Sequence, residues 1–136
     1  MSALVLINPK ITIATIDMSG FVTAVELPIE ADEVDNTAFG PAGWRTYLPG
    51  LKKGETKITF NDDFAVTTVD DRLWSWFGTI VAVALKAVNA ANSTTNPEYQ
   101  FNALASKMLP LAGKVGELAN QDVNWKVTGA ITRATS

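Results

Sequence analysis

The sequence predicts a mainly β protein, an antiparallel β-sandwich or barrel with one short flanking α-helix. Three observations predict this fold class. Apolar and polar residues alternate along most of the chain, as they do on half-buried strands. Glycine, proline, serine and asparagine form turn signals between the alternating runs. The 136 residues suffice for one core, and no repeat, low-complexity tract or linker divides them, so we expect a single domain over residues 1–136.

The alternation places the strands. It is clearest at residues 79–88, where Val81, Val83 and Leu85 form one row and the residues between them form the other. We expect eight strands, at residues 4–8, 11–17, 21–28, 32–38, 55–64, 79–88, 98–108 and 121–130. The stretch 89–96 reads NAANSTTN and is expected to be an exposed loop.

The segment 69–78, VDDRLWSWFG, departs from the alternation and predicts the helix. Thr68 is the expected N-cap, and Asp70 and Asp71 would lie in the first turn, where the helix dipole favours acids. Gly78 would follow the last turn. One face would carry the large apolar residues Leu73, Trp76 and Phe77. We expect this helix to plug one open end of the sandwich, and a second helical turn at residues 114–119.

The composition excludes several classes of function. The chain has no cysteine and no histidine, so disulfides, thiolate metal sites and a serine–histidine–aspartate triad are impossible. A net charge of −3 argues against phosphate-backbone binding as the main activity. No glycine-rich nucleotide loop is present, and no apolar run approaches the length of a membrane span. We therefore expect no cofactor, no metal, no membrane anchor and synthesis in the cytoplasm.

Residues 26–35 carry five acidic side chains and no basic one. A calcium site is one interpretation, but the run lacks the residue order of an EF-hand loop, and a solvated acidic face is the favoured reading. The pairs at 62–63 and 70–71 are read as turn and cap residues in the same way.

The segment 39–54 is long and rich in glycine, proline and aromatic residues, which is atypical of a hairpin connection. Trp44, Tyr47 and Leu48 would expose apolar surface there unless another subunit covers them. The nearby basic residues Arg45, Lys52, Lys53 and Lys57 allow two readings. One is a patch for single-stranded nucleic acid; the favoured one is contact with an acidic neighbouring surface.

The order of these motifs resembles that of siphophage tail tube proteins, also called major tail proteins. The residues that carry the resemblance read SGFVTAVELP at 19–28, ADEVDNTAFG at 31–40, WRTYLPGLK at 44–52, ITFNDDF at 58–64 and WKVTG at 125–129. The resemblance covers most of residues 17–130.

This resemblance implies a structural protein of the virion tail and not an enzyme. Tail tube proteins are β-sandwiches with a flanking helix, and they form hexameric rings that stack into a hollow tube for genome delivery. The implied partners are further copies of the chain and other tail proteins, such as the tape measure and the tail tip. DNA would pass through without specific binding, which an acidic wall favours because basic residues would hold phosphates.

Within this resemblance, two groups of residues are the candidate sites. The expected subunit or ring interface comprises Phe39, Trp44, Arg45, Tyr47, Leu48, Lys52 and Lys53. The expected acidic lumen or inter-subunit face comprises Glu30, Asp32, Glu33 and Asp35. We expect the basic members of the first group to meet the acidic residues of a neighbouring subunit.

Three alternatives stay open from the sequence. A capsid decoration protein or another head–tail structural protein would share the small β fold and the lack of catalytic signals. A monomeric carbohydrate-binding module would use Trp44, Tyr47 and Trp74. A hydrolase would need a carboxylate pair such as Asp62 and Asp70, although fourteen acidic residues make some pair inevitable.

Overall fold

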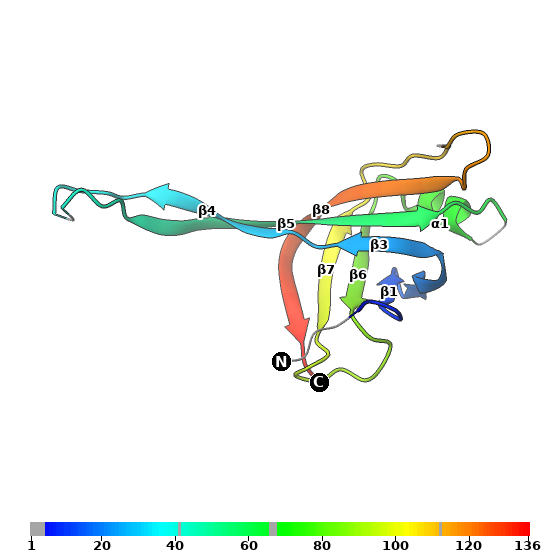
Figure 1. The fold of residues 1–136 in the computed structure, drawn as a ribbon, viewed down its shortest axis with the longest axis horizontal. Helices are drawn as coiled ribbons and strands as arrows, with labels where there is room; N and C mark the ends of the chain where they lie inside the picture. The colour runs from blue at the N-terminus through cyan, green and yellow to red at the C-terminus, as the bar shows by residue number, and fades with distance from the viewer. Residues whose placement is uncertain (1–4, 41, 66–67, 112) are drawn as a thin grey trace.

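One antiparallel sheet, curled into half a barrel, forms the body of the protein (Figure 1). The computed structural model describes residues 5–40, 42–65, 68–111 and 113–136. The strands are β1 (Lys10–Ile13), β2 (Ile16–Asp17), β3 (Val22–Glu26), β4 (Ile29–Asp35), β5 (Tyr47–Asn61), β6 (Ile80–Lys86), β7 (Glu98–Leu104) and β8 (Asn120–Ala134). Their order in the sheet is β2-β1-β6-β7-β8-β5-β3, and β4 pairs with β5 off this path. The predicted mainly β class with one α-helix is confirmed, and the sheet is single and curled.

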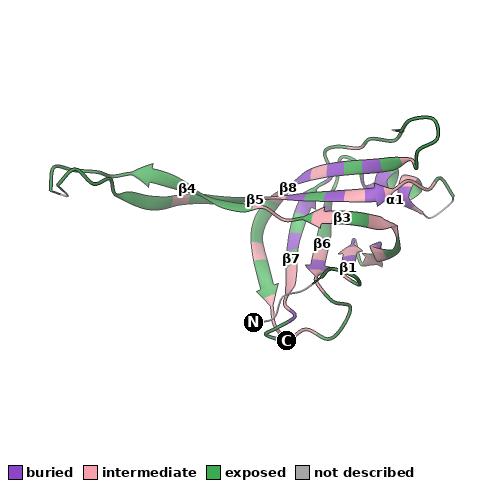
Figure 2. Cartoon of the chain, in the orientation of Figure 1, coloured by how far each residue is buried: buried purple, intermediate pink, exposed green. Residues whose placement is uncertain are grey.

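The alternation in the sequence decides which face of the sheet is buried. In β6, Val81, Val83 and Leu85 are buried and Ile80 and Ala82 are exposed. The same period of two holds in the inner parts of β5, β7 and β8, so one face of the curled sheet supplies the core (Figure 2). The largest fully buried side chain, Trp125, donates its indole N–H to the carbonyl of Lys107 at 2.9 Å.

The helix forms where the sequence predicts it, as α1 (Val69–Trp76). Val69, Leu73 and Trp76 are buried in the core, whereas Phe77 is about half exposed and lies off the predicted apolar face. Gly78 has a φ of +82°, as its predicted place after the helix requires. No helix in the described part of the chain is long and apolar enough to cross a membrane.

The N-cap of the helix is the predicted residue, but its side chain bonds differently from the prediction. Thr68 is the N-cap residue, but its side chain makes no capping bond. Its hydroxyl instead donates to the carbonyls of Ala65 at 2.6 Å and Asp63 at 3.0 Å. The hydroxyl therefore fixes the turn that enters the helix, and the first-turn acids Asp70 and Asp71 remain to complement the dipole.

Three predicted elements, at residues 4–8, 11–17 and 114–119, differ from the structure. Residues 5–8 form no strand, and residue 4 lies outside the described residues. The predicted strand 11–17 is split into β1 and β2 by Ala14 and Thr15, which both have positive φ in a two-residue hairpin turn. This turn lacks the usual glycine or asparagine, so no residue pattern predicted it. Residues 114–119 form only a turn, closed by the bond from the Glu117 N–H to the Lys114 carbonyl at 3.0 Å.

The largest difference concerns residues 39–54, which are not a long irregular connection. β5 begins at Tyr47 and runs for fifteen residues, so half of the predicted connection is strand. The register with β4 shifts between Ala31 and Glu33, where β5 accommodates an extra residue as a bulge. Gly50 sits at this bulge because a Cβ there would lie 3.0 Å from the Cβ of Asp32. Proline and glycine thus mark an edge hairpin here, not a loop.

Candidate assembly surface

A long two-stranded hairpin projects from the body (Figure 1). We call residues 29–54 the arm. β5 pairs with β8 and β3 only over its second half, from Glu55 onward, and with β4 over its first half. All seven residues of β4 are exposed, and none of the described residues of the arm belongs to the core (Figure 2). An isolated hairpin is at best marginally stable in water, so contact with a partner would stabilise the arm.

Hydrogen bonds order the arm tip, residues 36–46, of which all but Pro41 are described. The Asn36 N–H donates to the Thr46 carbonyl at 3.1 Å, and the Thr46 N–H donates to the Thr37 hydroxyl at 2.9 Å. The Asp35 carboxylate accepts the Thr37 N–H and an Arg45 N–H at 2.9 and 2.8 Å. Hydrogen bonding from Thr37 contributes most to holding the pKa of the Asp35 carboxyl below its usual value, and the bond from Arg45 contributes less. Strand ends and turn are therefore tied together at the tip.

The apolar residues predicted for the interface gather on this arm and are exposed. Phe39 and Trp44 lie in the tip, and Trp44 is 79% exposed. Tyr47 and Leu48 lie at the start of β5 and are each about half exposed. Leu51, which the sequence analysis did not select, is 81% exposed on the same strand. Exposed apolar side chains gathered in this way are typical of a protein–protein contact surface.

Two further apolar residues of the arm, Ile29 and Val34 of β4, are about half exposed and were not selected in the sequence analysis. Val34 lies directly opposite Leu48 in the register. The run 29–35 was read only for its charges, although three of its residues, Ile29, Ala31 and Val34, are apolar. Since successive residues of a strand point to opposite faces, Ile29 and Val34 lie on different faces of the hairpin, which therefore exposes apolar side chains on both.

The predicted acidic and basic residues meet within one chain. Lys53 contacts Glu30 at 3.6 Å, and Arg45 contacts Asp35 at 2.8 Å. Both pairs are exposed, so each contributes little to stability. Asp32 and Glu33 of β4, and Lys52 of β5, make no ion pair among the described residues. Charges for contact with a neighbour thus remain on the arm after its internal pairs are made.

The tryptophan and tyrosine residues proposed for carbohydrate binding are not brought together. Trp74 lies exposed on α1, at the end of the body away from the arm, so it does not join Trp44 and Tyr47 (Figure 1). Asp62 accepts a bond from the Gln121 amide at 3.1 Å, and burial, with the charges of Asp70 and Asp63, raises its pKa. No three acidic side chains of the described residues gather as a metal ligand set.

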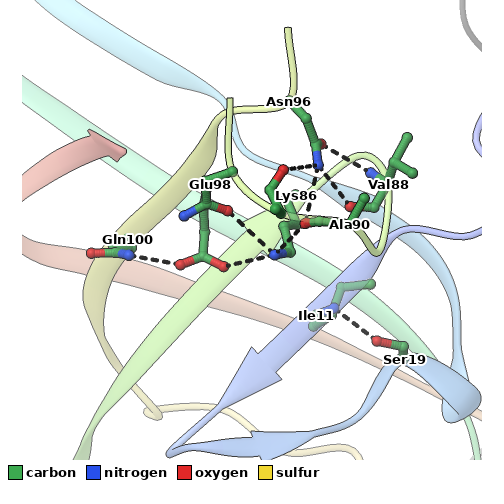
Figure 3. A network of polar contacts seen from close by, with 10 residues as sticks. Ile11, Ser19, Lys86, Val88, Ala90, Asn96, Glu98 and Gln100 are labelled. Carbon is green, nitrogen blue, oxygen red and sulfur yellow. Dashed lines mark hydrogen bonds and ion pairs between the residues drawn. The ribbon is translucent and has the colours of Figure 1, made fainter. Parts of the chain in front are cut away.

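The remaining polar cluster holds the loop between β6 and β7 (Figure 3). The Asn96 amide donates to the carbonyls of Val88, Ala90 and Ala91 at 3.1–3.3 Å. Lys86 donates to the Ala90 carbonyl at 2.8 Å and contacts Glu98 at 3.7 Å. Asn96 is buried, so the loop 89–96 is pinned at its end although most of it is exposed, as predicted.

No protein-family model and no curated protein matches the sequence. The fold, however, occurs in gene transfer agent particles. One similar chain belongs to the structure "Virion of native gene transfer agent (GTA) particle", with a TM-score of 0.74 and 17% identity. The match covers 93% of this chain and 95% of that chain.

A second similar chain belongs to "Tail of empty GTA particle computed with helical refinement, C6 symmetry". Its TM-score is 0.63 at 17% identity, and the match covers 84% of this chain and 82% of that chain. At this identity the likeness establishes a shared fold.

Proposed function

We propose that the protein is a structural subunit of a phage-type tail tube, which assembles into stacked hexameric rings around a channel for genome delivery. The observation that carries the proposal is the arm, an ordered hairpin with every β4 residue exposed and an apolar tip. The fold it shares with chains of a GTA virion and of a GTA tail with C6 symmetry supports the same function.

The open sheet also supports self-assembly. Within the described residues, β2 pairs only with β1 and β3 pairs only with β5, so the half-barrel ends in two strand edges. Joining the edge of one subunit to the other edge of the next would protect both. Such a contact is heterologous and closes by rotation into a ring, whereas rings stacked on each other form a filament.

The proposal gives the protein no catalytic activity and places it in the virion tail. Its partners are further copies of itself and other tail proteins, such as the tape measure and the tail tip. Phe39, Trp44, Arg45, Tyr47, Leu48, Lys52 and Lys53 form the subunit or ring interface. The acids Glu30, Asp32, Glu33 and Asp35 lie on the same arm, so we assign them to the inter-subunit face, and the net charge of −3 keeps passing DNA unbound.

The test is assembly by a variant with a truncated arm tip. We expect Trp44→Ala with Leu48→Ala to keep the wild-type melting temperature, because neither side chain is in the core. The double variant should form at least tenfold fewer rings or tubes in negative-stain images, with a lower mass by light scattering. Trp74→Ala is the control, since Trp74 is a tryptophan of similar exposure at the other end of the molecule. Undiminished tubes in the double variant would refute the assigned interface, and a wild-type chain that forms no ring at any concentration, even when seeded with tail tips, would refute the function.

A further inference from the structure

An apolar groove lies where the arm joins the open mouth of the half-barrel. It consists of two adjoining hollows of about 380 and 640 Å³ that share Ile29 and Tyr99 in their linings. The first is lined by apolar residues before β1 and at the end of β3, among them Leu6 and Leu27. The second lies between the arm and the outer part of β8, against Val127 and Ile131. We call the two hollows the root groove.

The root groove is held in shape at its rim. Lys86 and Ala87 line the first hollow at the end of β6, directly before the loop that Asn96 pins (Figure 3). Lys86 is itself fixed by Glu98 and the Ala90 carbonyl. A preformed apolar hollow of this kind can receive a side chain without prior rearrangement.

The arm tip has the chemistry that the root groove would accept. Phe39 and Trp44 are exposed aromatic residues, and burying each removes a large apolar area from water. The charges also match. Lys52 and Arg133 line the second hollow and have no ion-pair partner among the described residues. Asp32 and Glu33 of β4 are likewise without one, and Glu33 is the nearer of the two to the tip.

The tip cannot reach the groove of its own chain. The paired register of β4 and β5 keeps the arm extended, and Figure 1 shows the tip at the far end of the arm from the body. A second copy of the chain is therefore the occupant that the structure supports. Tip and groove are different surfaces, so the contact is heterologous and repeats from subunit to subunit.

We propose that the arm tip of one subunit docks in the root groove of the next, with Phe39 and Trp44 as apolar anchors and Glu33 facing Lys52 and Arg133. This inference rests on the proposed function and names the site that the arm engages. It assigns a role to Ile29, Tyr99 and Ile131, none of which was selected from the sequence.

The absence of cysteine allows a direct test by cross-linking. Ala38→Cys places a thiol in the exposed tip beside the anchors, and Ile131→Cys places one in the groove. The two full-length variants are mixed in equal amounts, oxidised mildly, and separated on a non-reducing gel, with circular dichroism to verify folding. Trp74→Cys replaces the groove variant in the matched control, and Ala87→Cys, in the first hollow, replaces Ile131→Cys should that chain not fold.

We expect the tip and groove variants together to give at least fivefold more cross-linked dimer than either alone or than the tip variant with Trp74→Cys. Equal yields with the groove and control variants would overturn the docking. Negative-stain images of the same samples separate the two proposals. Rings or tubes without the specific cross-link would refute the docking alone, whereas monomers without any cross-link would refute both.

Discussion

Two carboxyl groups of the body respond to folding in opposite directions. Burial raises the pKa of Asp62, with the charges of Asp70 and Asp63 adding to it, although a Gln121 hydrogen bond opposes the shift. Bonds from Ser19 lower the pKa of Asp17. An acid with a raised folded pKa favours folding most when it is protonated, below its unfolded pKa, and that advantage is lost as the pH rises through the folded value. An acid with a lowered pKa behaves in the reverse way.

We predict that Asp62→Asn raises the melting temperature at pH 7 and that this gain shrinks as the pH falls to 4. The amide removes a charge from a partly buried site and can donate to the Gln121 side-chain oxygen, which is buried without a partner among the described residues. Thermal unfolding followed by circular dichroism between pH 4 and 7 measures the effect.

Asp17→Asn is the matched control for this prediction. It should lower the melting temperature at pH 7, because the bonds from Ser19 favour the carboxylate, and its cost should shrink on acidification. A gain for Asp62→Asn that does not change with pH would contradict the assignment of the raised pKa.

At the scale of elements, the sequence predicts those helices and strands whose signals lie within one short segment. The helix was placed correctly because its first-turn acids, its apolar face and Gly78 all lie within one short segment. β6 and β7 were placed because one face of each is buried. The first half of β5 was missed because an arm without a core face leaves no burial pattern, and because Pro49 and Gly50 are typical of turns.

The helix should contribute strongly to stability although it is only eight residues long. We predict that Leu73→Ala lowers the free energy of unfolding by about 2–5 kcal/mol, since Leu73 is 1% exposed in the core that α1 completes. Trp74→Ala, one position along the same helix, should change it by less than about 0.5 kcal/mol because Trp74 faces solvent. Denaturant titration of both variants tests this difference, and similar losses would show that the helix does not plug the half-barrel through Leu73.

At the scale of the whole molecule, the division between body and arm decides what the sequence could reveal of the candidate site. The aromatic and charged residues of 39–54 were selected as a subunit or ring interface because an exposed cluster of such residues is unusual, and the structure places them exposed on the arm, whereas the interface itself stays a prediction. The groove was not predicted, since Ile29, Tyr99 and Ile131 lie on three strands that only the curled sheet brings together. The curling of a sheet depends on pairing between strands that are far apart in the chain, which cannot be deduced from one sequence.

The same division predicts that the arm is dispensable for folding and required for assembly. We expect a chain in which Asn-Gly replaces residues 32–51 to fold with a melting temperature within a few degrees of the parent, because the arm residues that the structure describes all lie outside the core and Ala31 pairs directly with Lys52 in the register. It should remain monomeric by light scattering at concentrations where the parent forms rings. A body that unfolds without its arm would show that the hairpin supports the sheet, and rings formed by the shortened chain would show that the sheet edges alone drive assembly. The predicted outcome, a stable monomer, requires instead that the sheet edges and the arm act together, each too weak to join subunits without the other.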